Sequence, residues 1–71
     1  MKIEFEPRIE RAIKYIEEKI SLPRWQITLA LEGSKEFKKK IPQKILKEAV
    51  QEVEKDHGEP IELIMLRARF G

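Results

Sequence analysis

Two stretches of the chain place apolar residues at the spacing of an amphipathic helix. Isoleucines recur every three or four positions over residues 7–21, at Ile9, Ile13, Ile16 and Ile20, which aligns them on one helix face. A second stripe of this kind runs to about residue 56 and consists of Ile45, Leu46, Ala49, Val50 and Val53. Pro7 and Pro42 suit a first helical turn, whereas Pro23 and the pair His57-Gly58 mark helix ends. The pattern therefore predicts two helices.

Other stretches alternate apolar and polar residues with the period of a half-buried strand. The clearest runs through Trp25, Ile27, Leu29 and Leu31, and shorter alternation at residues 3–5 predicts a strand before the first helix. Gly33-Ser34 is typical of a hairpin turn, and residues 36–41 are either a second hairpin strand or a helical turn capped by Ser34. Pro60 opens a last predicted strand over residues 61–70.

These elements predict one α+β domain over residues 1–71, a two-layer sandwich with two helices on one face of a sheet. If residues 36–41 form a strand, the order is βαββαβ and the layout is ferredoxin-like. If they do not, the sheet has three strands in the order βαβαβ. Both alternatives stay open from the residues alone.

Composition narrows the class of protein. The 71 residues include no Cys, which excludes disulfides and Cys-based metal sites, and the longest apolar run, residues 63–66, is far shorter than a membrane span of about 20 residues. We expect a soluble, cytoplasmic domain. Charged residues make up 39% of the chain, and the Glu and Lys enrichment is a tendency of proteins from hot environments, although a helix-rich surface gives the same bias.

Catalytic groups are sparse in this sequence. His57 is the single histidine, and its position beside Gly58 suits a cation at a helix C-terminus. The three glycines stand apart at positions 33, 58 and 71, so no glycine-rich phosphate loop is present. We expect no enzymatic activity, no cofactor and no metal site.

The charges are arranged in blocks. Residues 35–47 carry six lysines against one glutamate, whereas residues 48–62 carry six acidic residues against one lysine. Lysines at a helix start and acids at its end oppose the helix dipole, and Glu48, Glu52 and Asp56 repel one another at four-residue spacing. A pattern that works against its own helix favours a function, and we interpret the basic block as an anion or nucleic-acid site formed by Lys38, Lys39, Lys40, Lys44, Arg67 and Arg69. One alternative interpretation is that the lysines only solvate a loop. Another is a head-to-tail contact, in which the basic block of one copy meets the acidic block of a second copy.

The predicted strand 61–70 is apolar on both faces, although only one face of the sheet would be covered by helices. Ile61, Leu63 and Met65 then form an open apolar row, which predicts a homodimer interface. The sequence thus indicates a non-enzymatic, homodimeric binding module for nucleic acid or a phosphate-bearing ligand, with no membrane partner. The alternative is a protein–protein adaptor or small regulatory subunit that docks another protein through strand 61–70.

Overall fold

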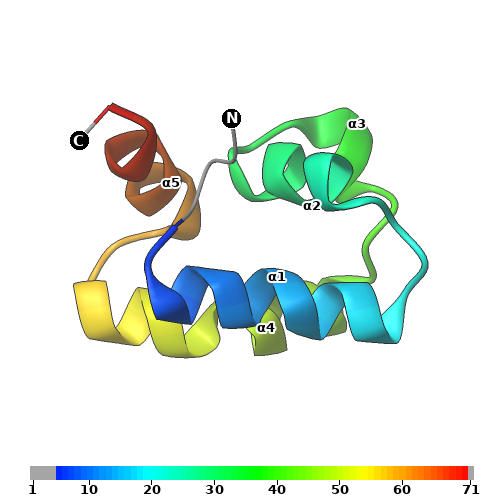
Figure 1. The fold of residues 1–71 in the computed structure, drawn as a ribbon, viewed down its shortest axis with the longest axis horizontal. Coiled ribbons are helices and arrows are strands. Elements are labelled where there is room, and N and C mark those ends of the chain that lie inside the picture. The colour runs from blue at the N-terminus through cyan, green and yellow to red at the C-terminus, as the bar shows by residue number, and fades with distance from the viewer. Residues whose placement is uncertain (1–4, 71) are drawn as a thin grey trace.

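The computed structural model describes residues 5–70, and these residues form five helices (Figure 1). The helices are α1 (Pro7–Lys19), α2 (Arg24–Leu31), α3 (Lys35–Lys38), α4 (Gln43–His57) and α5 (Ile61–Phe70). Residues 5–70 contain no strand, so the predicted α+β sandwich is wrong in both its ferredoxin-like and its three-stranded form. Most of the strand predicted at residues 3–5 lies outside the described residues.

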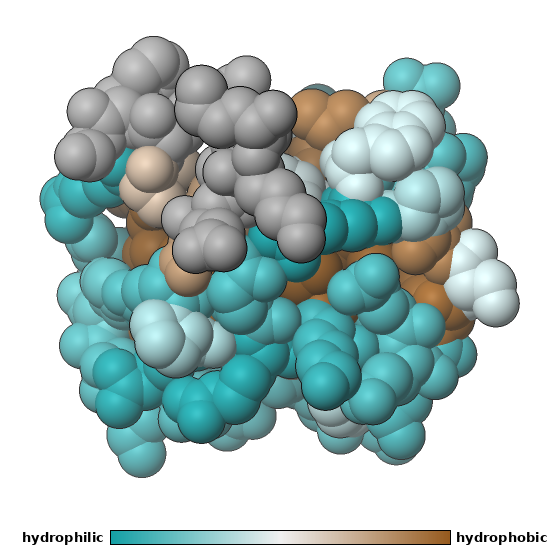
Figure 2. Space-filling model, in the orientation of Figure 1, coloured by the Kyte–Doolittle hydropathy of each residue, from teal (hydrophilic) through white to brown (hydrophobic). Residues whose placement is uncertain are grey.

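The helices form two layers (Figure 1). In one layer α1 and α4 lie side by side and antiparallel, and α2, α3 and α5 cover them in the other. The outer face of α1 is hydrophilic, and apolar side chains show in the seam between the layers (Figure 2). The core of this small protein therefore lies between the layers, where every helix except α3 contributes fully buried residues.

The two predicted helices are confirmed. Ile9, Ile13 and Ile16 of α1 are each 1% exposed or less, and they pack with Val50 and Val53 of α4 in one cluster. Helix α4 ends where the sequence predicts it, because Gly58 adopts the left-handed conformation at φ 69°, which glycine reaches without steric cost.

Helix α2 replaces the strand that looked clearest in the sequence. Its buried residues are Ile27, Ala30 and Leu31, which have the i, i+3, i+4 spacing of one helix face. Trp25, which an alternating strand would place on the same face as Ile27, is 58% exposed. The segment fits both the alternation of a strand and the 3.6-residue period of a helix. Its Arg, Gln, Leu and Ala residues are good helix formers.

Helix α5 shows the same ambiguity. Ile61, Ile64 and Met65 are 4% exposed or less, whereas Leu63 and Leu66 are 46% and 51% exposed. Two of the three residues predicted to form a dimer interface, Ile61 and Met65, thus lie in the core of their own chain. No open sheet face exists among the described residues, so that interface loses the basis on which it was predicted.

Gly33 ends a helix, where the sequence suggested a hairpin turn. Gly33, at φ 106°, follows Glu32, the C-cap residue of α2. The Gly33 and Ser34 amides donate to the carbonyls of Ala30 and Leu29 at 3.1 and 3.0 Å. This pair of bonds is a Schellman motif. Residues 35–38 then form the helical turn α3, as one of the two alternatives predicted, although the Ser34 side chain makes no capping bond.

The acidic row on α4 has structural partners on α1. The Arg8 guanidinium donates a hydrogen bond to Asp56 and lies 3.6 Å from Glu52. The Tyr15 hydroxyl donates to Glu48 at 3.3 Å. The repulsion that the sequence predicts within α4 is therefore offset by contacts between the helices.

Glu10 ties α1 to the start of α2. Its carboxylate accepts hydrogen bonds from the Phe5 amide at 2.9 Å and from the Arg24 guanidinium at 2.8 and 2.7 Å. The Arg24 hydrogen bond lowers the pKa of Glu10 below its usual range, with a smaller contribution from the Phe5 amide. The ionised form is the one that holds the two helices together.

The two faces of α5 predict opposite outcomes for aspartate substitutions. Met65→Asp buries an unpaired carboxylate, which costs several kcal/mol out of a total stability of about 5–15 kcal/mol, so we expect this variant to be largely unfolded. Leu63→Asp lies on the exposed side and should cost less than about 1 kcal/mol. Urea unfolding followed by far-UV circular dichroism measures both. Equal losses in the two variants would contradict the helical register of α5.

The lowered pKa of Glu10 predicts an acid-dependent loss of stability. Because the folded pKa lies below the unfolded value of 4.5, this group stabilises the fold above pH 4.5 and loses that effect as the pH falls through the folded pKa. We expect Glu10→Gln to be less stable than the unmodified chain at neutral pH, and the difference to shrink below pH 4.5. Glu18→Gln, at an exposed α1 position, is the matched control and should show no such difference.

Candidate functional site

A groove of about 600 Å³ lies between α3, α4 and α5. Its apolar lining is formed by Ile41, Leu46, Val50 and Ile61. Ile41, Val50 and Ile61 belong to the buried core, whereas Leu46 is half-buried. The groove is therefore a place where the surface opens onto core side chains, and its floor offers apolar contact to another molecule.

Two polar contacts hold the walls of this groove. The Lys38 ammonium on α3 donates to the Glu62 carboxylate on α5 at 2.8 Å. The Glu54 carboxylate on α4 accepts from the Ile61 amide at 2.7 Å, which satisfies one of the free N–H groups at the start of α5. A Cβ at Gly33 would stand 3.3 Å from the Glu62 side chain, so the glycine also lets α2 and α5 approach closely.

The ion pair sets the charge state of the groove. The Lys38 hydrogen bond lowers the pKa of Glu62 below its usual range, against a smaller opposing effect of burial. The hydrogen bond thus favours the ionised form of Glu62, and Lys38 is used to hold α3 against α5.

Three further lysines line the groove: Lys35, Lys39 and Lys47. All three are exposed, and within residues 5–70 none of them forms an ion pair with a carboxylate. The groove thus combines an apolar floor with positive charge that the fold leaves uncompensated. Such a surface can bind a molecule that is both acidic and apolar.

The structure brings together only part of the predicted anion site. Lys38 and Lys39 line the groove, but Lys38 is paired with Glu62. Lys40 lies over the Phe37 ring, 5.3 Å from its centroid, and Lys44 is exposed on α4 outside the lining of the groove. The sequence analysis included Lys35 and Lys47 in the basic block but not among the predicted site residues. For Lys35, its four-residue spacing from Lys39 was the available signal.

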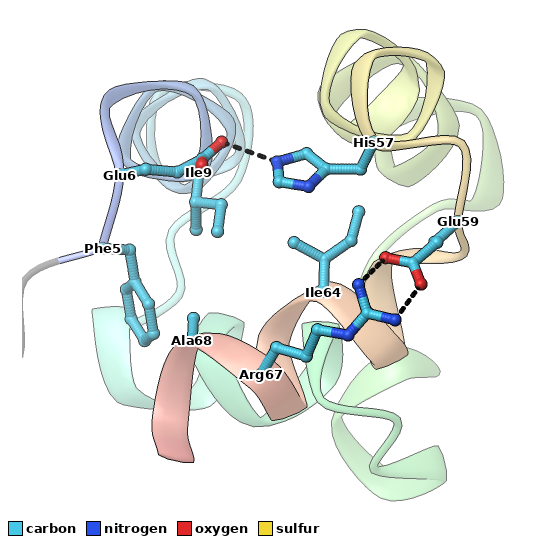
Figure 3. Close-up of a pocket in the computed structure, with 8 residues that line it drawn as sticks. All are labelled: Phe5, Glu6, Ile9, His57, Glu59, Ile64, Arg67 and Ala68. Atoms are coloured by element: carbon cyan, nitrogen blue, oxygen red, sulfur yellow. Dashed lines mark hydrogen bonds and ion pairs between the residues drawn. The ribbon is translucent and has the colours of Figure 1, made fainter. Parts of the chain in front are cut away.

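A second pocket, of about 330 Å³, lies where the start of α1, the end of α4 and α5 meet (Figure 3). Arg67, a predicted anion contact, is paired here with Glu59, and its Nη1 donates at 2.6 Å. The other predicted contact from this region, Arg69, has a side chain outside the described part of the structure. Arg67 therefore lies in a different pocket from the lysine groove.

His57 is placed in this second pocket. Its Nε2 lies 3.1 Å from Glu6 Oε1, so it links the end of α4 to the residue before α1 (Figure 3). The described residues contain no group of three or more His, Asp or Glu side chains that could hold a metal ion. The contact of His57 with Glu6 therefore connects the end of α4 to the start of α1.

The family comparison gives one result. The chain matches the FeoB cytosolic helical domain over residues 5–71, which is nearly its whole length. No curated protein and no solved structure matches it. None of the helices in the described residues is long and apolar enough to cross a bilayer.

This match decides several of the predictions. A module for nucleic acid or phosphate ligands is the wrong function, and so is an adaptor or regulatory subunit docking through strand 61–70, because the chain matches a domain of an iron transporter. The predicted cytoplasmic location is confirmed. The chain belongs to the family of FeoB cytosolic helical domains, which are part of the ferrous iron transporter FeoB.

Proposed function

We propose that this domain acts within a ferrous iron transporter without catalysing a reaction, and that its groove between α3, α4 and α5 holds another cytosolic segment of the same transporter. The observation that supports this proposal is a set of three unpaired lysines around an apolar floor, which are Lys35, Lys39 and Lys47. Occupation of the groove would link the position of this domain to the transport cycle.

The distribution of charge contacts supports this proposal. On the α1–α4 side, Arg8 is paired with Asp56 and Glu52, and at the start of α2 Arg24 is paired with Glu10. These cations serve the fold itself. Lys35, Lys39 and Lys47 form no such pair within residues 5–70, so their charge is available to a partner.

The apolar floor points in the same direction. Leu46 is half-buried and packs on the core from the groove side, so an occupant would complete its burial. Removing apolar surface from water contributes about 25 cal/mol per Å², and the lysines add long-range attraction that orients an acidic partner. A groove with both features favours docking of a folded or folding segment.

Charge reversal in the complete transporter tests this function. Exposed ion pairs contribute roughly 0.2–1 kcal/mol each, so the triple variant K35E/K39E/K47E should weaken docking about tenfold or more once repulsion is included. We expect the initial rate of ferrous iron uptake by transporter-containing vesicles to change several-fold from the unmodified rate. The expression level and detergent-extracted oligomer size should stay the same.

A matched control separates docking from total charge. The variant K14E/K19E/K55E changes the charge by the same amount at three exposed lysines outside the groove and should transport iron at the unmodified rate. Equal uptake rates in the two triple variants would contradict the proposed function.

We also expect the His57→Ala variant to take up iron at the unmodified rate, because the proposal assigns no chemical step to this domain.

A further inference from the structure

We infer that the occupant of the groove is an acidic amphipathic helix, with an apolar stripe flanked by glutamate or aspartate side chains. This inference rests on the proposed function, because it names the chemistry of the segment that the groove would hold. Three properties of the groove carry it: the chemistry of its floor, the kind of backbone it can accept and the placement of its charges.

The floor selects bulky apolar side chains. Val50 and Ile61 are 4% and 2% exposed and contact the groove only at their edges, whereas Leu46 stands half-buried at its side. A volume of about 600 Å³ lies within the usual range of about 300–1,000 Å³ for ligand sites. A volume of this size can take several side chains of one helix face.

The walls select a helical backbone. They are built from α3, α4 and α5, and residues 5–70 offer no strand edge to which an extended peptide could add. An extended segment would leave its own N–H and C=O groups unpaired over the apolar floor, which is costly. A helix satisfies these groups internally, and helix-in-groove binding uses apolar anchors at i, i+3, i+4 and i+7.

The lysines select acidic flanks. Lys35 in α3 and Lys39, the C-cap residue that follows α3, are four residues apart on one wall, and Lys47 is on the α4 wall. The acids of the groove, Glu54 and Glu62, already accept from the Ile61 amide and Lys38. A helix with acids on both sides of its apolar stripe therefore meets a lysine on each wall, whereas a basic helix would meet repulsion.

The binding test uses a synthetic peptide probe. The probe is a fluorescent helix with leucines at i, i+3, i+4 and i+7 and glutamates at the flanking positions, and its twin carries lysines in place of the glutamates. We expect fluorescence anisotropy to show saturable binding of the acidic probe to the 71-residue chain, weakened by added salt. The basic twin should not bind.

Variants of the chain locate the binding. K35E/K39E/K47E and Leu46→Glu should each weaken the acidic probe about tenfold or more, which corresponds to about 1.4 kcal/mol. K14E/K19E/K55E should bind it as the unmodified chain does. Far-UV circular dichroism of every variant must match that of the unmodified chain, and Leu46→Ala serves as a milder second substitution if Leu46→Glu unfolds. Equal binding of the two peptides, or equal loss in both triple variants, would overturn the inference.

Other anionic partners are separate outcomes. An oligonucleotide, or vesicles of phosphatidylglycerol, that bind the chain more tightly than the acidic probe and lose binding in K35E/K39E/K47E would also overturn it. In the complete transporter, a photo-crosslinking residue at position 46 should capture an acidic helical segment of the transporter. Capture of a segment without acidic residues would contradict the inference.

The two proposals can fail separately. If K35E/K39E/K47E alters iron uptake but the chain does not bind the acidic probe, the groove serves transport with a different occupant, and only the inference fails. If the chain binds the probe through Lys35, Lys39 and Lys47 but uptake is unchanged in the triple variant, the proposed function fails and the groove chemistry stands.

Discussion

The antiparallel packing of α1 on α4 is the contact on which the other helices depend. Each of these two helices has more than twelve residues, whereas α2 has eight and α3 has four, and isolated helices shorter than about 12–15 residues are marginal in water. The isoleucines of α1 and the valines of α4 form one side of the core. Helices α2 and α5 pack on this side of the core through fully buried residues, which are Ile27, Leu31 and Met65. The short helices are thus stabilised mainly by burial on this platform.

The charge pattern of α4 follows from the same packing. In the sequence, Glu48, Glu52 and Asp56 look like a helix working against itself, and this suggested a functional reason. In the structure the row faces α1, where Arg8 and Tyr15 provide its partners. The unusual acids therefore serve the fold, whereas Lys35, Lys39 and Lys47 of the groove form no ion pair within residues 5–70. Acidic residues that are unfavourable within their own helix can thus be explained by contacts with the neighbouring helix, without a ligand.

The sequence predicted the two long helices and missed the two shorter apolar ones. For α1 and α4 the 3.6-residue period is unopposed, because polar residues fill the other faces. In α2 and α5, apolar residues occupy nearly every position between Ile27 and Leu31 or Ile61 and Leu66, so alternation and helical spacing can both be found. The exposure of Trp25 and Leu66 shows which period the tertiary packing selects. The high helix propensity of Leu, Met, Ala and Arg was the signal that could have favoured helices over strands in these two segments.

The candidate site was predictable only as a region. The basic block was visible in the sequence, but the choice between structural and available lysines depends on contacts such as Lys38 with Glu62, 24 positions apart. Local spacing carries no information about such a pair. Arg67 shows the same limit, because its partner Glu59 places it in another pocket from the lysines with which it was grouped.

The groove and the fold are physically coupled through α3. This four-residue helix contributes no buried residue, and it is held by the edge contact of Phe37 with Trp25 and by the Lys38–Glu62 ion pair. The Lys38–Glu62 ion pair, which lowers the pKa of Glu62, keeps the α3 wall facing α5. A molecule that binds only the folded groove stabilises it by mass action, and most of that effect would fall on the wall with the least buried surface. Two of the three lysines that attract an occupant, Lys35 in α3 and Lys39 directly after it, therefore lie where the occupant can change the structure most.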